Sequence, residues 1–344
     1  MKRIFTISVV MILALTLSAQ SNYSPCYTNN MSKGNTAFSQ GKYSEARTYY
    51  VNAKQCAGGN PTEAQKKINQ CNAKLTQSSA PTSRTDQTYT VNGVSFKMVY
   101  VQGGTFTMGC TSEQGGDCED DEKPIHSVTL SDFCIGETEV MQALWESVMG
   151  TTVREQRDKA EDPSWSIPGE GASYPMYYVS WDEAVEFCNK LNEKLRRQLP
   201  SGYRFALPTE AQWEYAARGG NKSRHYKYAG SDNINEVAWY TSTTNDSGTK
   251  PVKTKQPNEL GLYDMSGNVW EWCSDWEGNY SSPAQSDPKG PSPSLFRVIR
   301  GGSWYNDARS CRVSYRYCFD PDLRINNSRN PLHRSFGFRL ALSK

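Results

Sequence analysis

Several motifs that mark common enzyme classes are missing from this sequence. Its 344 residues include only three histidines, which stand far apart at positions 126, 225 and 333. No HExxH, CxxC, GxSxG or GxxxxGK(S/T) pattern occurs. These absences argue against a zinc hydrolase, an α/β-hydrolase and a P-loop nucleotide-binding protein. A one-sided charge excess is missing too, because the formal net charge is only +2, which argues against a nucleic-acid binder.

Long hydrophobic runs are also missing, except at the N-terminus. There Lys2 and Arg3 precede the apolar run Ile4–Leu17, and a small-residue cleavage site ends at Ala19. This order is typical of a secretory signal peptide, predicted over residues 1–19. No later stretch is long and apolar enough to span a bilayer. We therefore expect an exported protein (periplasmic, cell-surface or secreted) with no transmembrane segment in the mature chain.

Export would allow the chain's 10 cysteines to form disulfides. Cys110 and Cys118 flank a glycine-rich loop and could close it, whereas Cys56 and Cys71 could tie two helices together. The spacing leaves other pairings open. Unpaired buried thiols are the alternative for the remaining cysteines.

Residues 20–75 are predicted to form a small all-α module. Small and large apolar residues, such as Phe38, Ala46 and Tyr50, recur at helical spacing on either side of a glycine turn. The pattern resembles one tetratricopeptide-type helix–turn–helix, followed by a third helix over Pro61–Leu75. A single repeat cannot bury a continuous core, so it must dock on something or be cross-linked. The module is expected either to bind a protein partner or to act as a stalk-like hairpin.

A linker and one large domain are predicted to follow. Residues 76–88, TQSSAPTSRTDQT, lack apolar periodicity, which indicates a flexible linker. Residues 89–344 begin with hairpin-like alternation and continue with a helix over Thr138–Met149 and two helices that start at capping boxes, at Ser180 and Thr209. Long loops rich in Gly, Pro and Asn separate these elements, and the mixture favours an α+β fold over a parallel α/β sheet.

Four long motifs stand in a distinctive order along the large domain. They are LPTEAQWEYAARGG (Leu207–Gly220), GLYDMSGNVWEWCSDW (Gly261–Trp276), RVIRGGSW (Arg297–Trp304) and GFRLA (Gly337–Ala341). This order resembles that of the formylglycine-generating enzyme, or sulfatase-modifying factor, family. The resemblance covers nearly all of residues 89–344 and implies a C-type-lectin-like α+β domain with little regular secondary structure.

The enzymes of that family oxidise a sulfatase cysteine to formylglycine, with a copper ion held by two cysteines in a CxxxxC arrangement. In this sequence Cys311 matches the second cysteine, whereas Asn306 stands in place of the first. Copper(I) prefers soft thiolate ligands, and a lone thiolate cannot form the two-coordinate site. We therefore expect neither a copper site nor a catalytic residue. The alternative is a sulfatase-modifying oxidase in which Cys311 is the remaining ligand.

Calcium is the cofactor that the resemblance does imply. Asp264, Gly267, Val269 and Glu271 match a calcium site of the family. Two carboxylates and two main-chain carbonyls on a tight loop offer the hard oxygen ligands that calcium prefers. The alternative is that Glu271 only caps neighbouring turn N–H groups. A separate acidic loop, Asp117–Glu122, is expected to be a solvated charge cluster, with calcium binding as its alternative.

Residues Tyr305–Phe336 have an unusual composition. The segment contains no Lys, Glu, Gln, Met or Trp, although Lys and Glu are common elsewhere. It is rich in residue types that can be reached from an AAC or AAT codon by changing only the adenines: Asn, Asp, Tyr, Ser, Arg, Cys, Phe, His, Leu and Ile. This composition resembles the variable region of proteins diversified by a diversity-generating retroelement, which use the same lectin-like fold. The alternative is an ordinary polar loop of a non-catalytic family member.

The sequence thus predicts an exported, non-catalytic protein that displays a diversified surface to a protein or cell-surface ligand. Tyr and Phe supply contact area at low entropy cost, and Ser and Asn supply adaptable hydrogen bonds. The recurring arginines are expected to be fixed residues that bond loop carbonyls: Arg309, Arg312, Arg316, Arg324 and Arg339. The expected contact residues are Tyr305, Asn306, Asp307, Ser310, Tyr315, Tyr317, Cys318, Phe319, Asp322, Ile325, Asn326 and Asn327.

Overall fold

The computed structural model describes residues 23–78, 85–159, 166–291, 293–322 and 334–344. The predicted signal peptide lies outside these residues. The chain forms two compact units, Met1–Ala80 and Pro81–Lys344. Within the described ranges, no helix has both the length and the apolar character needed to cross a membrane.

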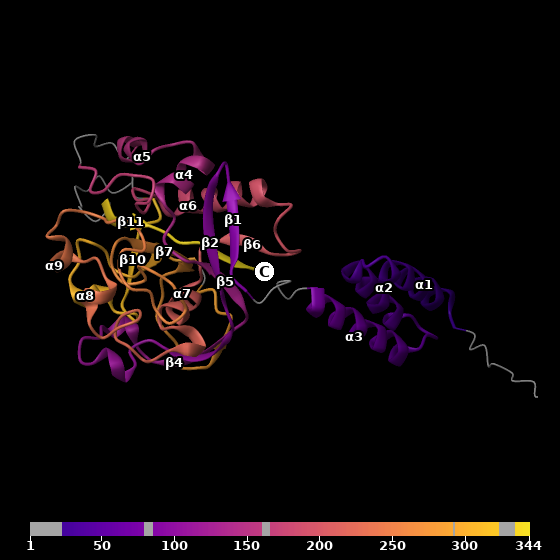
Figure 1. Ribbon diagram of the computed structural model, residues 1–344. Coiled ribbons are helices and arrows are strands. Elements are labelled where there is room, and N and C mark those ends of the chain that lie inside the picture. The colour runs from indigo at the N-terminus through magenta and orange to yellow at the C-terminus, as the bar shows by residue number, and fades with distance from the viewer. Residues whose placement is uncertain (1–22, 79–84, 160–165, 292, 323–333) are drawn as a thin grey trace, which may run out of the picture. The chain divides into compact units, whose positions relative to one another are not determined.

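The first unit is a module of three helices (Figure 1). They are α1 (Pro25–Ser39), α2 (Tyr43–Gln55) and α3 (Pro61–Ser78). The first two approach closely at Gly34, where an added Cβ would lie 2.6 Å from the ring of Tyr50. Tyr50 and Ala46 are completely buried in the core that the three helices share. The predicted all-α hairpin module is therefore confirmed.

The cysteines of this module pair differently from the expectation. Cys26, in the first turn of α1, forms a disulfide with Cys56 at the end of α2, with their Cα atoms 5.8 Å apart. The pairing of Cys56 with Cys71, one of those that the sequence left open, is not formed. Cys71 continues the apolar face of α3 that Ala64 and Ile68 begin, so its thiol packs into the core instead of facing another cysteine.

The predicted linker is shorter than expected at both ends. Residues 76–78 continue α3, and residues 87–88 already belong to the first strand, β1 (Gln87–Val91). Residues 79–84 lie outside the described chain.

The described residues of the second unit form three small sheets, several strands of which are labelled in Figure 1. The largest has the strand order β1-β2-β5-β12-β6, and all its neighbouring strands are antiparallel. β1 and β2 are joined by Asn92 and Gly93, which have φ values of 48° and 84° and form the tight turn that Asn-Gly favours. The remaining strands are β2 (Val94–Val101), β5 (Phe133–Gly136), β6 (Arg204–Ala206) and β12 (Ala341–Ser343).

Of the other two sheets, the four-stranded one carries parts of three of the four family motifs. A four-stranded sheet has the order β10-β9-β7-β11, and β11 runs parallel to β7. Its strands are β7 (Trp270–Trp276), β9 (Arg297–Arg300), β10 (Arg316–Phe319) and β11 (Phe336–Gly337). The three-stranded sheet consists of β3 (Gly104–Met108), β4 (His126–Leu130) and β8 (Gln285–Ser286).

Short helices connect and cover these sheets. They are α4 (Gln142–Met149), α5 (Val153–Lys159), α6 (Trp181–Leu195), α7 (Glu210–Ala217), α8 (Ile234–Val237) and α9 (Thr241–Thr244). The capping boxes predicted at Ser180 and Thr209 are both present. α4 begins later than predicted, because Val140 and Met141 lie in extended backbone that bonds to Phe338 and pairs with Pro175.

Two apolar cores meet at the four-stranded sheet. Ile299 of β9 packs in the core around α4 and α6, which includes Trp145 and Phe187. Its neighbour Val298 packs in the other core, which includes Trp213 of α7. Successive strand residues point to opposite faces, so β9 separates the two cores. The mixture of short helices and curled sheets confirms the α+β class.

Candidate binding surface

Three aromatic residues of the predicted variable region line one face of β10. Tyr317 and Phe319 alternate along the strand, and Tyr315 directly precedes it, so all three point to the same side. Trp270 of β7 lies against them, with its ring centroid 6.1 Å from those of Tyr315 and Tyr317. Tyr317 is 44% exposed, whereas Trp270 is buried. The strand therefore presents aromatic area to solvent over a buried indole.

The intervening residues of β10 point to the opposite side. Arg316 is buried, and its guanidinium donates to both carboxylate oxygens of Glu210, at 2.9 and 2.8 Å. Cys318 is half-buried on the same side, where burial and then the charge of Glu277 raise the pKa of its thiol to about 11. The structure thus separates Cys318, an expected contact residue, from Tyr317. Strand alternation in the sequence could have shown this.

The loop before β10 supplies one further exposed ring. Tyr305 is 40% exposed and packs edge-on against the buried Trp304, with ring centroids 5.3 Å apart. The polar residues that follow hold the loop itself. Asn306 Oδ1 accepts a hydrogen bond from Ser303 Oγ at 2.5 Å. Asp307 and Ser310 bond each other at the start of a 3₁₀ turn, the Ser310 N–H donating to Asp307 Oδ1 at 3.2 Å.

The remaining expected contact residues lie at the end of this segment. Asp322 is half-buried, and its N–H donates to Asp320 Oδ1 at 2.9 Å. Ile325, Asn326 and Asn327 lie outside the described residues, as does Arg324.

Buried arginine–glutamate pairs lie within and beside the predicted variable region. Arg312 is fully buried, with Nη2 at 2.5 Å from Glu122 Oε1. The same kind of pair occurs at Arg300–Glu214, Arg316–Glu210 and Arg339–Glu271. Loop carbonyls are additional partners, such as that of Asp117, which accepts from Arg312 at 3.0 Å. The main partners of Arg312, Arg316 and Arg339 are therefore carboxylates, which sequence reasoning missed, and not the loop carbonyls that it expected.

The expectation of a solvated acidic loop is wrong at Glu122. Its side chain is completely buried at the end of a 3₁₀ turn. Burial alone would raise the pKa of Glu122, but hydrogen bonds from Arg312 and Ser314 outweigh burial and hold this pKa below its usual value. Glu122 is therefore an ionised internal partner of the variable segment.

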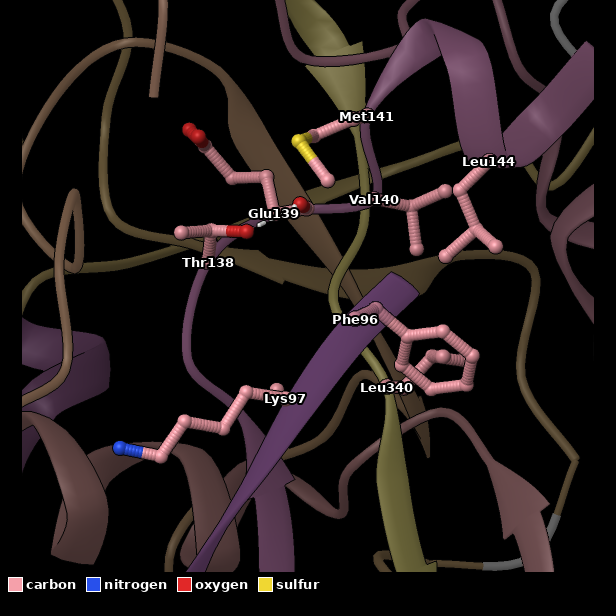
Figure 2. Close-up of a pocket in the computed structure, with 9 residues that line it drawn as sticks. Phe96, Lys97, Thr138, Glu139, Val140, Met141, Leu144 and Leu340 are labelled. Carbon is pink, nitrogen blue, oxygen red and sulfur yellow. Dashed lines mark hydrogen bonds between the residues drawn. The ribbon is translucent and has the colours of Figure 1, made fainter. Parts of the chain in front are cut away.

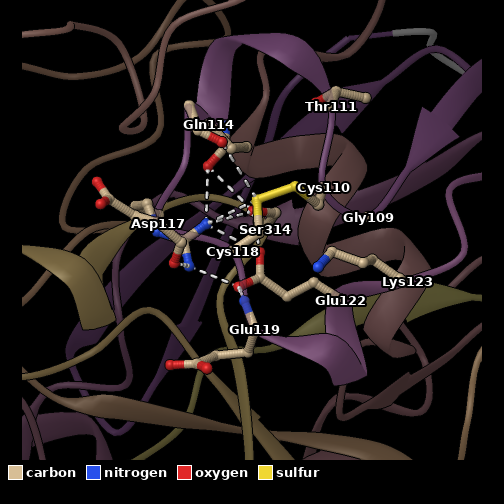
Figure 3. Close-up of a disulfide and its surroundings, with 12 residues drawn as sticks. Gly109, Cys110, Thr111, Gln114, Asp117, Cys118, Glu119, Glu122, Lys123 and Ser314 are labelled. Atoms are coloured by element: carbon tan, nitrogen blue, oxygen red, sulfur yellow. Dashed lines mark hydrogen bonds and ion pairs between the residues drawn. A yellow bond between two sulfur atoms is a disulfide. The ribbon is translucent and has the colours of Figure 1, made fainter.

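A disulfide closes the loop that directly precedes Glu119 (Figure 3). Cys110 and Cys118 are bonded as the sequence suggested, with Cα atoms 6.0 Å apart. Outside the disulfide, Arg309 reaches Glu119 at 2.5 Å, but both side chains are well exposed. Arg309 is thus a surface residue and differs from the buried arginines.

Cys311, within the predicted variable region, is completely buried. Apolar and aromatic residues enclose it, including Tyr228, Val237 and Tyr240. Its Sγ lies 3.5 Å from the carbonyl oxygen of Asp307 and donates to it. Burial raises the pKa of the Cys311 thiol far above its usual value, so the thiol is neutral.

Glu271 and Asp264 of the tryptophan-rich stretch are buried near Arg339. Glu271 accepts hydrogen bonds from Arg339 Nε and Nη2, at 2.5 and 2.6 Å, and from Trp213 Nε1 at 2.6 Å. Asp264 Oδ2 accepts from the Lys253 N–H at 2.9 Å. Asp264 Oδ1 is buried and has no hydrogen-bond partner among the described residues.

Glu139 is a third buried carboxylate at this place, and sequence reasoning missed it. It accepts hydrogen bonds from the Val269 N–H at 3.2 Å and from Asn268 Nδ2 at 3.1 Å. Glu139 therefore caps the turn, and the alternative that gave this role to Glu271 is wrong. Burial, and then the charge of Asp264, raise the pKa of Glu139 well above its usual value. The adjoining cavity in Figure 2 measures only about 20 Å³, which is room for one water molecule.

Comparison with known proteins identifies the second unit. Residues 84–344 match the family described as "Sulfatase-modifying factor enzyme 1-like domain". The chain belongs to this family. The sequence-based assignment of a sulfatase-modifying factor domain is confirmed.

The relatives of this sulfatase-modifying factor domain include proteins named as a variable protein, an enzyme and a chaperone. Treponema denticola variable protein 1 is 32% identical, and its structure superposes with a TM-score of 0.61 over 77% of this chain and 100% of that one. The formylglycine-generating enzyme of Streptomyces coelicolor is 30% identical over 71% of this chain and 88% of its own. Chaperone protein LppX of Paenibacillus barcinonensis is 33% identical over 66% of this chain and 85% of its own.

The residues present do not fit the copper site of the family's oxidases. Cys311 is a neutral, enclosed thiol, and Asn306, in place of the first cysteine, has its side chain bonded to Ser303. An amide is a poor substitute for a thiolate on copper(I). Within the described ranges, moreover, no three His, Cys, Asp or Glu side chains are arranged to hold a metal.

The carboxylates near Asp264 offer oxygen ligands of the kind that calcium prefers. Glu139, Asp264 and Glu271 are all buried, and among the described residues the only guanidinium paired with any of them is that of Arg339, with Glu271. A divalent cation would balance the excess negative charge, and Asp264 Oδ1 is an unused hard ligand. Because the side chains alone do not form a metal site, main-chain carbonyls would have to complete the coordination.

Proposed function

We propose that this sulfatase-modifying factor chain is an exported, non-catalytic protein that binds a protein or cell-surface ligand through a diversified surface, Tyr305–Asn327. The proposal rests on the difference between the two faces of β10. Its aromatic face is open to solvent, whereas its other face is held by the buried pair of Arg316 and Glu210. Because the two sets of residues alternate, the outward side chains can change without removing the bonds that hold the strand.

The exposed rings suit recognition of a macromolecule. Tyr305 rests on Trp304 and Tyr317 rests on Trp270, so neither ring has to be ordered by the ligand. Prior ordering lowers the entropy cost of binding, and tyrosine combines apolar area with a hydrogen-bonding group. The arginines beneath the surface are already paired with carboxylates, which leaves them unsuited to binding phosphates of nucleic acid.

Export and a separate role for the helical module belong to the same proposal. The two disulfides are typical of an oxidising compartment, which agrees with the signal-like N-terminus. The module has its own core and its own disulfide, so it is suited to act as a spacer or as a second site for a protein partner.

Diversification is tested at the gene. We expect a nearby reverse-transcriptase gene and a near-copy of the 3′ end with adenines at the variant positions. Independent isolates should differ at outward positions such as Tyr305 and Tyr317 and agree at Arg312 and Arg316. The absence of a template copy, or changes spread evenly over both faces of β10, would reduce the protein to a non-catalytic member with a fixed surface.

Binding itself is tested by adding the fluorescently labelled chain to a panel of intact cells of different species. The double variant Tyr305→Ala/Tyr317→Ala should bind at least about tenfold more weakly, because clustered aromatic residues dominate such interfaces. Ile125→Ala is the matched control, since Ile125 is a 50% exposed apolar residue outside the variable region. Equal binding by the double variant and the control would contradict the proposed surface.

The alternative function is a sulfatase-modifying oxidase. It is favoured by the 30% identity with the Streptomyces enzyme. The oxidase should bind copper(I) stoichiometrically and convert a cysteine-containing sulfatase peptide, and Cys311→Ala should abolish both. That result would replace the binding proposal.

We also propose that a calcium ion stabilises the domain. Asp264 and Glu271 would hold it with the carbonyl oxygens of Gly267 and Val269. The ion would supply positive charge to a site whose carboxylates outnumber its paired guanidinium, and so would support the neighbouring strand β7.

A further inference from the structure

A pocket of about 300 Å³ lies on the side of β10 that carries Arg316. The start of α7, the end of β7 and the loop over residues 278–291 form its walls. Trp276, Tyr280 and His126 contribute aromatic surface, and the rings of His126 and Tyr280 are in edge contact with centroids 4.7 Å apart. The pocket is separate from the proposed variable surface, because Tyr317 points to the opposite face of the strand.

The guanidinium of Arg316 supplies the positive charge of the pocket, and all three of its nitrogens donate hydrogen bonds to protein oxygens. Arg316 donates through Nε and Nη2 to Glu210, and through Nη1 to the carbonyls of Gly278 and Asp121, at 2.9 and 3.2 Å. The guanidinium of Arg316 is therefore not free to bind an anionic ligand. Glu210, in turn, is balanced by Arg316 and also lies 3.6 Å from the Nε of Arg300.

Asp275 is different, because its carboxylate forms no salt bridge with any described residue and feels Arg316 only at longer range. The residue lines the pocket and is only 3% exposed. Its Oδ2 accepts hydrogen bonds from the Glu210 N–H at 3.1 Å and from Ser274 Oγ at 2.8 Å. Its Oδ1 accepts no hydrogen bond from any described residue. Because Asp275 lines the pocket, a ligand that supplies both a proton donor and positive charge could bond its Oδ1 there.

We propose that this pocket binds an organic ammonium ion, with the ammonium group donating to Asp275 Oδ1 and the alkyl part against Trp276 and Tyr280. A neutral apolar ligand would leave the carboxylate unsatisfied, and an anion would be repelled by it. The walls match an alkyl chain, since Met108, Ala211 and Pro291 add apolar surface beside the aromatic rings.

The protonation of Asp275 agrees with this assignment. Burial, and then the charge of Glu210, raise the pKa of Asp275 to about 7. An ammonium ion would take the place of that proton, so its affinity should rise between pH 6 and pH 8. The other titratable or charged groups that face the pocket are Glu210, Arg316, His126 and Tyr280.

Matched four-carbon probes test the proposal on the full chain by calorimetric titration. Butylammonium should bind saturably, whereas 1-butanol and butyrate, which share its length, should bind at least tenfold more weakly. Equal binding of butylammonium and 1-butanol, or no saturable binding of butylammonium, would overturn the assignment. Nα-acetyl-lysinamide in place of butylammonium distinguishes a lysine of a protein ligand, if it binds more tightly, from a small free amine.

Variants locate the binding in this pocket. Asp275→Asn keeps the shape, and it should weaken butylammonium binding at least tenfold and remove the dependence on pH. Ser281→Trp should block the pocket from its exposed rim without touching Asp275, whereas Ser282→Trp, one residue outside the lining, should have no effect. If Asp275→Asn does not fold, the two serine variants still decide, because equal binding by both would refute the site.

Discussion

Replacing Arg312 with methionine should destabilise the domain far more than the same replacement of Arg309. Both residues lie in the predicted variable region, and both pair at 2.5 Å with a glutamate that follows Cys118 within four residues. The pair of Arg312 with Glu122 is completely buried, whereas the side chains of Arg309 and Glu119 are 49% and 39% exposed. Residue type, substitution and charge change are therefore matched, and burial is the main difference.

The magnitudes follow from what each change leaves behind. Arg312→Met leaves the Glu122 carboxylate buried with Ser314 as its remaining side-chain donor, which should cost about 3–5 kcal/mol. Arg309→Met breaks a solvated pair, which should cost about 0–1 kcal/mol. At roughly 2–4 °C per kcal/mol for a domain of this size, the first variant should lose about 6–20 °C in Tm. Adding Glu122→Gln to Arg312→Met should recover part of the loss, because the uncompensated charge is removed.

Urea unfolding followed by tryptophan fluorescence, with Tm from calorimetry, measures these differences. The dependence on pH gives a second check. Because the pKa of Glu122 is lowered in the fold, its contribution is present above its ordinary value of 4.5 and is lost as the pH falls through the folded pKa. The gap between the wild type and Arg312→Met should therefore narrow in acid. If Arg312→Met costs no more than 1 kcal/mol beyond Arg309→Met, the pair does not hold the segment.

Four further predictions follow from the same structure. Tyr317→Ala should change Tm by less than about 2 °C in calorimetry, since half-exposed side chains contribute little, and a large loss would show that the ring belongs to the core. Cys118→Ser should cost about 2–3 kcal/mol in urea unfolding from the lost loop closure, and no cost would mean that the loop is fixed without the disulfide. Chelator should lower Tm and added calcium restore it, with no shift in Asp264→Asn; an unchanged wild-type Tm would refute the calcium site. Asp275→Asn should flatten the fall in stability between pH 5 and pH 8, because a carboxyl whose folded pKa is about 7 destabilises the fold as the pH rises from 3.8 through that value; parallel pH profiles would contradict this.

Local features of this fold were predictable from the sequence. The capping boxes at Ser180 and Thr209, and the Asn92-Gly93 hairpin, depend on residues within a few positions of one another. The family motifs were also sufficient to predict the α+β class. The Cys110–Cys118 disulfide, which closes a separation of 8 residues, belongs to the same group.

The partners of buried charges were not predictable in this way. Glu122 reads as part of an acidic surface loop, and only the contact with Arg312, 190 residues away, shows why it is buried. Glu139 similarly caps a turn 130 residues further along the chain. The choice between Cys26 and Cys71 as the partner of Cys56 depends on which helix faces turn inward, and that follows from packing of all three helices.

Trp270 has a consequence for how such a surface could evolve. The indole lies outside the variable segment, so it would stay constant while residues 315 and 317 are exchanged. Any side chain substituted at these two positions would have to pack against the same indole ring of Trp270. Side chains with a planar or slender apolar stem would do so readily, whereas short ones would uncover the indole. Packing against Trp270 would thus limit which side chains are accepted at positions 315 and 317, whatever the ligand.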